Sequence, residues 1–196
     1  MVDLEPQPQS GGRDLDPRVE RSRRVILGAA LDLLGEIGFG GVTIEAVAAR
    51  AGVGKSTIYR HWPGKLELIE DAICTLKARL APPAGETTRD RVIHVLRQAA
   101  SNVADAPWST CLPAIIDAAQ RDPEVKVIHR RLSLERRQFL IDVLADGVAR
   151  GEISSDRDLA LVADCLFGPI VVRRLLLHEP LDPENVPALV DEVLRG

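Results

Sequence analysis

Apolar residues in this chain recur at intervals of three and four, which is the spacing that an amphipathic α-helix requires. The first series comprises Ile26, Ala29, Ala30, Leu33, Leu34 and Ile37, and similar series continue along the sequence. No stretch alternates apolar and polar residues as a half-buried β-strand does. Aromatic residues make up 3% of the chain, so leucine, valine, isoleucine and alanine must build the core. The sequence therefore predicts an all-α fold.

Capping residues and helix breakers divide this pattern into about nine helices. Asp16 and Pro17 form a helix-start signal, because aspartate can cap a helix and proline suits its first turn. Gly38 should end that helix, Thr43 should cap the second, and Gly52 should end the second. The expected helices cover about 17–38, 43–52, 54–62, 65 onward, 89–104, 110–120, 123–150, 156–178 and 183–195.

The helices are expected to form two domains. Residues 17–66 should form a three-helix domain, and residues 67–196 a larger helical domain. Residues 1–16 have no apolar periodicity and carry two prolines and two glycines, so we expect a disordered tail. The tail lacks the apolar segment of a secretory signal, and no run reaches the roughly 18 apolar residues that span a bilayer. We therefore expect a cytoplasmic protein without a membrane span.

Charge is unevenly distributed along the chain, whose formal net charge is −4. Residues 18–65 carry eight basic and four acidic side chains, a net charge of +4, whereas the segments on either side are acidic. A short basic block inside an acidic protein predicts a localised site for a polyanion. The three cysteines lie far apart and lack metal-ligand spacing, so we expect reduced thiols, no metal site and no cofactor.

The run Gly54-Lys55-Ser56-Thr57 resembles the end of a nucleotide-binding phosphate loop, but two features argue against that interpretation. The loop needs another glycine five residues before Gly54, where this chain has Ala49. It also needs a buried strand upstream, whereas the preceding residues have helical spacing. No serine, cysteine or histidine lies in a recognisable nucleophile motif. A nucleotide-binding switch or a helical enzyme is therefore a remote alternative.

The same segment fits a helix–turn–helix over residues 43–62, in which the second helix enters the major groove of DNA. Ile58 and Trp62 are four residues apart on this second helix and should pack inward. The other side chains can form hydrogen bonds, as contacts with phosphates and base edges require. These polar residues are Lys55, Ser56, Thr57, Tyr59, Arg60 and His61.

The segment resembles the DNA-binding domain of the tetracycline-repressor (TetR) family of bacterial transcription regulators. The matching positions are Thr43, Ile44, Val47, Ala48, Ala51, Gly52 and Val53, then Lys55, Thr57, Ile58, Tyr59, His61 and Trp62, then Lys65 and Leu68. The resemblance is close over about residues 20–70 and architectural over 71–196. It implies a homodimeric repressor that binds a palindromic double-stranded DNA operator and is released by a small-molecule effector.

The resemblance also implies roles for individual residues at the DNA. Thr43, Tyr59, His61 and Lys65 match positions that contact backbone phosphates in members of that family. Positions where base choice is usually made are matched by Lys55, Ser56, Thr57 and Arg60. Gly54 occupies a position that is commonly serine, which is the better helix cap.

The C-terminal half should supply the dimer interface. Between Leu159 and Leu177, 14 of 19 residues are hydrophobic, so this helix should be buried on more than one side. Gly168 and Pro169 should kink it. Together with the last helix it should form a four-helix interface with a second subunit. The residues expected in that interface are Leu166, Ile170, Leu189, Val190 and Val193.

The same half should contain the effector site. The candidates for an apolar pocket between helices are Trp108, Cys111, Phe139 and Phe167. The arginines at positions 130, 131, 136 and 137 are expected on the exposed face of the long helix. In the alternative interpretation, the four candidates are ordinary core residues and the second domain serves only for dimerisation.

Overall fold

The computed structural model describes residues 17–77, 82–104 and 108–195, except for the side chains of Leu76, Lys77 and Trp108. The described residues contain nine α-helices and no β-strand, which confirms the all-α prediction. In chain order the helices are α1 (Pro17–Gly41), α2 (Ile44–Ala51), α3 (Lys55–Tyr59), α4 (Lys65–Lys77), α5 (Thr88–Ala104), α6 (Trp108–Arg121), α7 (Pro123–Ala149), α8 (Leu159–Val172) and α9 (Val186–Arg195). The tail expected over residues 1–16 lies outside the described residues.

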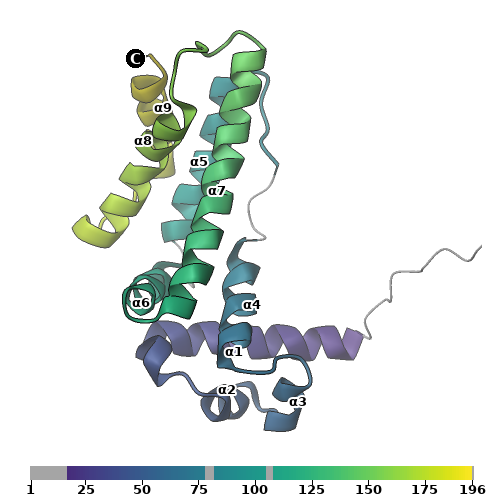
Figure 1. Ribbon diagram of the computed structural model, residues 1–196. Coiled ribbons are helices and arrows are strands. Elements are labelled where there is room, and N and C mark those ends of the chain that lie inside the picture. Colours follow the sequence, from purple (N-terminus) through teal and green to yellow (C-terminus); the bar gives the residue numbers. More distant parts are fainter. Residues whose placement is uncertain (1–16, 78–81, 105–107, 196) are drawn as a thin grey trace, which may run out of the picture.

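The helices form two groups (Figure 1). Helix α1 lies across the foot of the long helices, with α2 and α3 below it and α4 rising from it. Above α1, helices α5 and α7 run side by side, α8 and α9 flank them, and α6 lies at their lower end. Helix α1 packs against α2 and α4 in its own group and against α6 in the other. It therefore provides the main contact between the two groups.

Capping residues define the ends of the N-terminal helices as expected. Gly38 has φ 68° and ψ 169°, so it interrupts the helical conformation near the end of α1. The Thr43 hydroxyl accepts a hydrogen bond from the Ala46 amide at 3.1 Å and caps α2. Gly52 ends α2 in the left-handed conformation (φ 68°), which any other residue would adopt at a cost in free energy.

Helices α3, α8 and α9 are clearly shorter than expected. Helix α3 ends at Tyr59, and a turn continues to Trp62. Helix α8 begins at Leu159, because the Asp158 carboxylate accepts hydrogen bonds from two free amides of the first turn. A short 3₁₀ turn, Pro183–Asn185, precedes α9 in place of the first turn of the expected helix.

Helix α8 changes its winding near its end. Pro169 lies inside the helix and has no N–H to donate to the carbonyl four residues earlier. Directly after Val172 the chain forms a π-helical segment, Arg173–Leu177, which ends at His178 with φ 56°. Such wider turns are rare and are often found at functional sites.

One continuous core extends through both groups of helices. Ile26 and Leu34 of α1 belong to the same cluster of buried side chains as Leu96 of α5, Leu144 of α7 and Leu166 of α8. No helix of the described residues combines the length and apolarity needed to cross a membrane. The domain boundary expected near residue 66 stays a prediction, and α4, which begins there, packs against α1.

Candidate nucleic-acid interface and internal cavity

Helix α3 is attached to the molecule by one apolar face. Ile58 is fully buried, and Trp62, in the turn after α3, is 2% exposed. The Trp62 indole N–H donates a hydrogen bond to Asp71 Oδ2 at 2.7 Å, and the Arg23 guanidinium donates to the same oxygen at 2.6 Å. Asp71 therefore joins α1, the turn after α3, and α4. The prediction that Ile58 and Trp62 pack inward is confirmed.

The other side of α3 is polar and accessible. The exposed residues are Lys55, Ser56, Tyr59 and Arg60, and the half-buried ones are Thr57 and His61. Within the described part of the chain, the Arg60 guanidinium has no hydrogen-bond or ion-pair partner. A row of donors on an outward face suits acceptors such as phosphate oxygens and base edges. The individual roles expected for these six residues stay predictions.

The surroundings of Lys55 do not fit a phosphate loop. Gly54 caps α3, and the helix before the turn is α2, so the run Gly54 to Thr57 lies between two helices. A phosphate loop lies between a strand and a helix. This segment therefore lacks the structural setting of a nucleotide-binding switch.

Lys55 is paired with a carboxylate on the neighbouring helix. Its Nζ donates a hydrogen bond to Glu45 Oε1 at 3.1 Å, and both side chains are more than half exposed. The hydrogen bond from Lys55 is the main cause that lowers the pKa of the Glu45 carboxyl. Glu45 lies in the first turn of α2, where a negative charge is also favoured by the helix dipole. The surface therefore carries an acidic group beside one of its expected base-reading residues.

Lys65 has a structural contact that sequence reasoning missed. Its Nζ donates a hydrogen bond to the Phe39 carbonyl oxygen at 3.0 Å and lies 4.2 Å from the centroid of the Phe39 ring. The side chain is half-buried at the start of α4, and Phe39 follows the interruption of α1 at Gly38. Lys65 thus ties α4 to the end of α1. An ammonium group has three N–H donors, so this contact leaves donors for a phosphate.

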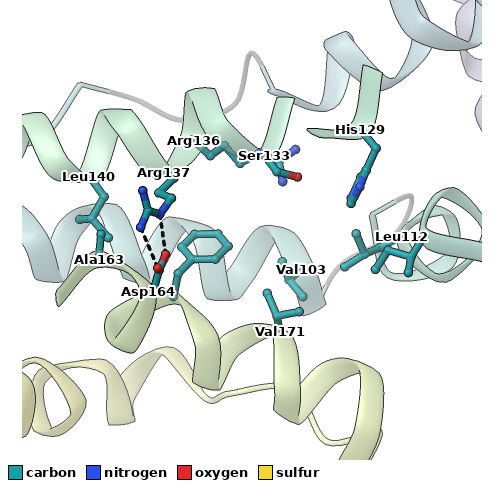
Figure 2. A pocket seen from close by; sticks show the side chains of 12 residues that line it. Val103, Leu112, His129, Ser133, Arg136, Arg137, Leu140, Ala163, Asp164 and Val171 are labelled. Atoms are coloured by element: carbon teal, nitrogen blue, oxygen red, sulfur yellow. Dashed lines mark hydrogen bonds and ion pairs between the residues drawn. The ribbon is translucent and has the colours of Figure 1, made fainter. Parts of the chain in front are cut away.

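A cavity of about 280 Å³ lies between α5, α6, α7 and α8 (Figure 2). Its lining residues are Val103, Leu112, Ile116, His129, Ser133, Arg136, Arg137, Leu140, Ala163, Asp164, Phe167 and Val171. Among the four expected pocket residues, Phe167 lines this cavity. Cys111 and Phe139 do not: Cys111 is fully buried beside α1, and Phe139 is half-buried against the core. The Trp108 side chain lies outside the described residues.

The four arginines of α7 were expected on its exposed face. Two of them, Arg136 and Arg137, instead line the cavity. Arg137 donates to both carboxylate oxygens of Asp164, from Nε at 2.6 Å and from the terminal nitrogen at 2.8 Å. Arg136 is half-buried, and burial lowers the pKa of its guanidinium to about 10. Burial, with a smaller contribution from Arg136, also lowers the pKa of His129. The usable signal in the sequence was the spacing of His129, Ser133 and Arg136 at helical intervals.

Helix α6 connects this cavity with α1. Leu112 and Ile116 form part of the cavity wall. The adjacent Cys111 thiol donates a hydrogen bond to the Leu31 carbonyl oxygen of α1 at 3.2 Å. Burial raises the pKa of this thiol, which keeps it protonated as a donor. A displacement of α6 at the cavity would therefore reach α1 directly.

A second connection joins α7 with α4. The Arg131 guanidinium forms an ion pair with the Glu70 carboxylate. In addition, the Arg174 guanidinium of the π-helical segment donates to the Ser109 carbonyl oxygen of α6 at 2.7 Å. These contacts attach α7 to α4 and the start of α6 to the π-helical segment. The cavity walls are thus linked to both α1 and α4.

Three of the five residues expected in a dimer interface face the core of their own chain. Leu166 and Val190 are fully buried and Ile170 is 1% exposed, so these side chains have no surface left for a second subunit. Leu189 and Val193 are half-buried. The correction has a physical reason: α8 is apolar on all sides, and sequence periodicity does not distinguish its inner from its outer face.

The outer face of α8 carries the apolar surface instead. Leu161, Cys165, Val172 and Leu176 are exposed at helical spacing along α8 and the π-helical segment. Leu161 is 60% exposed and Leu176 is 71% exposed. We call these four residues the α8 stripe. A contiguous exposed apolar surface of this kind is typical of an interface between proteins.

Within the described residues, no group of three His, Cys, Asp or Glu side chains is placed to bind a metal ion.

Two protein-family models match the chain. "Bacterial regulatory proteins, tetR family" matches residues 26–72, and "Tetracyclin repressor-like, C-terminal domain" matches residues 82–193. The two matches together include the helix–turn–helix and every helix that lines the cavity.

The chain is also similar over most of its length to named transcriptional regulators. The HTH-type transcriptional regulator YdeS of Bacillus subtilis (strain 168) is 34% identical, with 92% of this chain and 91% of YdeS covered. The DNA-binding transcriptional repressor TetR of Mycobacteroides abscessus is 31% identical, with coverage of 90% and 94%. The TetR family transcription regulator SCO0332, for which there is a crystal structure, is 32% identical in sequence to this chain. The similarity covers 90% of this chain and 98% of SCO0332, and the two structures superpose with a TM-score of 0.68.

Proposed function

Because this chain belongs to the TetR family and is a DNA-binding transcriptional regulator, we propose that it represses transcription as a homodimer bound to a palindromic operator in the cytoplasm. A small-molecule effector, bound in the cavity, releases it from the DNA. The observation that carries this proposal is the division of α3 into a buried face, fixed through Trp62 and Asp71, and an exposed polar face. A helix held in this way can enter a major groove without losing its attachment to the domain.

The proposed DNA contacts divide into two kinds. Contacts with phosphates, which set the position on the duplex, are assigned to Thr43, Tyr59, His61 and Lys65. Contacts with base edges, which select the sequence, are assigned to Lys55, Ser56, Thr57 and Arg60. Arg60 is the best candidate for base recognition, because its exposed guanidinium can donate two parallel hydrogen bonds to a guanine.

The proposed dimer forms through the α8 stripe, with Leu189 and Val193 of α9 at its edge. Packing α8 and α9 against their copies would give a four-helix interface with two-fold symmetry. The stripe supports this arrangement because Leu161 and Leu176 would otherwise remain in water. A two-fold dimer presents two copies of α3, which is what a palindromic operator requires.

The cavity favours an effector over the alternative in which the second domain only dimerises. A domain used only for dimerisation is expected to have a filled core, whereas about 280 Å³ is open here between helices, among walls that are mostly apolar. The proposed coupling runs through α6, from Leu112 at the cavity to Cys111 at α1. An effector acts in this way only if it binds the DNA-competent and DNA-incompetent conformations with different affinities.

The test is selection of bound sites from a pool of random duplex DNA with the purified protein. We expect a pseudo-palindrome whose half-sites lie about one helical turn (roughly 34 Å) or somewhat more apart. Enrichment of a single unrepeated half-site would contradict binding as a two-fold dimer. Absence of any enriched sequence, with retention of the whole pool at low salt, would contradict sequence-specific repression.

A further inference from the structure

One side of the cavity is polar, and all of its polar residues except Asp164 of α8 come from α7. His129, Ser133 and Arg136 occupy positions i, i+4 and i+7, so their side chains lie on one face of the helix. Figure 2 shows them in a row along α7. Apart from Asp164, the residues from the other three helices are apolar: Val103 of α5, Leu112 and Ile116 of α6, and Ala163, Phe167 and Val171 of α8.

The charges of the lining residues do not balance. The lining contains two guanidinium groups, of Arg136 and Arg137, and one carboxylate, of Asp164. Arg137 holds Asp164 through two hydrogen bonds, so these two charges compensate one another. The lowered pKa of His129 favours its neutral form. Counted over the lining residues alone, one positive charge remains, on the side formed by α7.

Arg136 is suited to bind an anion at this position. Its pKa of about 10 leaves the guanidinium charged near neutral pH, although it is half-buried. A carboxylate accepts charge-assisted hydrogen bonds from a guanidinium, and these are stronger where water is partly excluded. A guanidinium has five N–H donors in a planar fork that matches the two oxygens of a carboxylate, so it can accommodate a ligand in addition to its contacts within the chain.

We propose that the effector is a small organic monocarboxylate, bound through its carboxylate to Arg136, with its apolar part against Leu112 and Phe167. This inference rests on the effector role proposed for the cavity. One net positive charge matches a single negative charge on the ligand better than the two of a phosphate monoester. The volume of about 280 Å³ lies at the lower end of the range for ligand sites, which limits the size of the apolar part.

The experiment measures binding of matched charged and neutral probes to the full chain. The probes are benzoate, phenylacetate and octanoate, each paired with its primary amide, and binding is followed by titration calorimetry. We expect at least one carboxylate to bind about 10- to 100-fold more tightly than its amide, the range for a charge-assisted hydrogen bond. Amides that bind as tightly as their acids would overturn the inference. So would a failure of all six probes to bind at millimolar concentration.

A variant pair localises the charge preference. Arg136→Gln should reduce carboxylate affinity to that of the amide, and Arg136→Lys should restore part of the difference. Arg130→Gln is the matched control, because Arg130 is an exposed arginine of α7 outside this cavity. Operator binding of each variant establishes that it is folded. A carboxylate preference that survives Arg136→Gln would assign the charge recognition to another residue and overturn the inference.

Operator binding in the presence of the best probe separates this inference from the proposed function. If the carboxylate binds through Arg136 but leaves operator affinity unchanged at saturation, the ligand class holds and the effector role fails. If a neutral amide binds and releases the operator while the acids do not, the effector role holds and the carboxylate assignment fails.

Discussion

The indole N–H of Trp62 lies 2.7 Å from Asp71 Oδ2, in a hydrogen bond that joins the turn after α3 to α4. Arg23 of α1 donates to the same oxygen at 2.6 Å, and its guanidinium carbon lies 5.9 Å from the centroid of the Trp62 ring. One carboxylate thus fixes the orientation of α3 relative to both α1 and α4. The exposed face of α3 depends on this contact, although none of its three members belongs to that face.

Trp62→Phe should destabilise the N-terminal helices, although it alters no residue of the exposed face of α3. The variant loses the hydrogen bond to Asp71 and leaves a small void, at a cost of about 1–3 kcal/mol in the free energy of unfolding. Urea denaturation followed by circular dichroism measures this loss. Tyr59→Phe is the control, because Tyr59 is 53% exposed and should change stability by less than about 0.5 kcal/mol. Equal effects of the two substitutions would contradict the anchoring role of Trp62.

Glu45→Gln should strengthen DNA binding. The substitution removes a negative charge from the proposed interface and releases the Lys55 ammonium from its ion pair, so that its positive charge acts on the DNA in addition to its proposed base contact. Filter-binding titrations over a salt series should show tighter binding and a slope steeper by about one unit per subunit. Asp117→Asn, which removes the partner of Arg121 on α6, is the control and should have little effect. Unchanged binding by Glu45→Gln would place the Lys55–Glu45 pair away from the DNA.

Arg60→Ala and Lys65→Met should weaken operator binding in different ways. Loss of a bidentate base contact at Arg60 should cost about 1–3 kcal/mol per half-site and relax preference at one symmetric pair of positions. Loss of a phosphate contact at Lys65 should weaken operator and scrambled duplexes alike and make the salt slope shallower by about one unit per subunit.

The two variants are compared on both duplexes over the same salt series. If Arg60→Ala weakens both duplexes equally, Arg60 contacts a phosphate and the base-reading face of α3 is assigned wrongly. If Lys65→Met weakens binding without changing the slope, Lys65 acts through its hydrogen bond to the Phe39 carbonyl alone.

Leu176→Glu should separate the subunits without unfolding them. Leu176 is 71% exposed in the single chain, so a charge there is tolerated by the monomer but not by an apolar interface. Sedimentation velocity should show monomers with unchanged helicity. Val190→Glu places the same charge at a fully buried position and should instead unfold the chain. A Leu176→Glu variant that sediments as an undiminished dimer would contradict the assigned interface.

The sequence was most informative where local rules determine structure. The cap at Thr43, the left-handed Gly52 and the inward face of Ile58 and Trp62 follow from residue type and helical spacing, and all four were predicted. Such features depend on neighbours within one or two turns. The helix–turn–helix could therefore be placed without knowledge of the rest of the fold.

The sequence was least informative where two distant elements meet. Leu166, Ile170 and Val190 are apolar like the residues of the α8 stripe, and only the packing of α8 against α5, α7 and α9 decides which face is buried. Arginine is usually found on the surface, yet the approach of α8 to α7 leaves Arg136 half-buried at the cavity. Such outcomes depend on tertiary contacts, which periodicity within one helix does not encode.

Helix α6 places Leu112 at the cavity and Cys111, the preceding residue, against α1. Because neighbouring residues of a helix point in different directions, one rigid element can take part in two sites that share no side chain. In the proposed coupling, the signal that crosses α6 is a displacement, which carries no information about the chemistry of the ligand. Mutations in the cavity can consequently change which molecule is sensed while the operator stays the same. Regulators built in this way can acquire new signals for an existing set of genes.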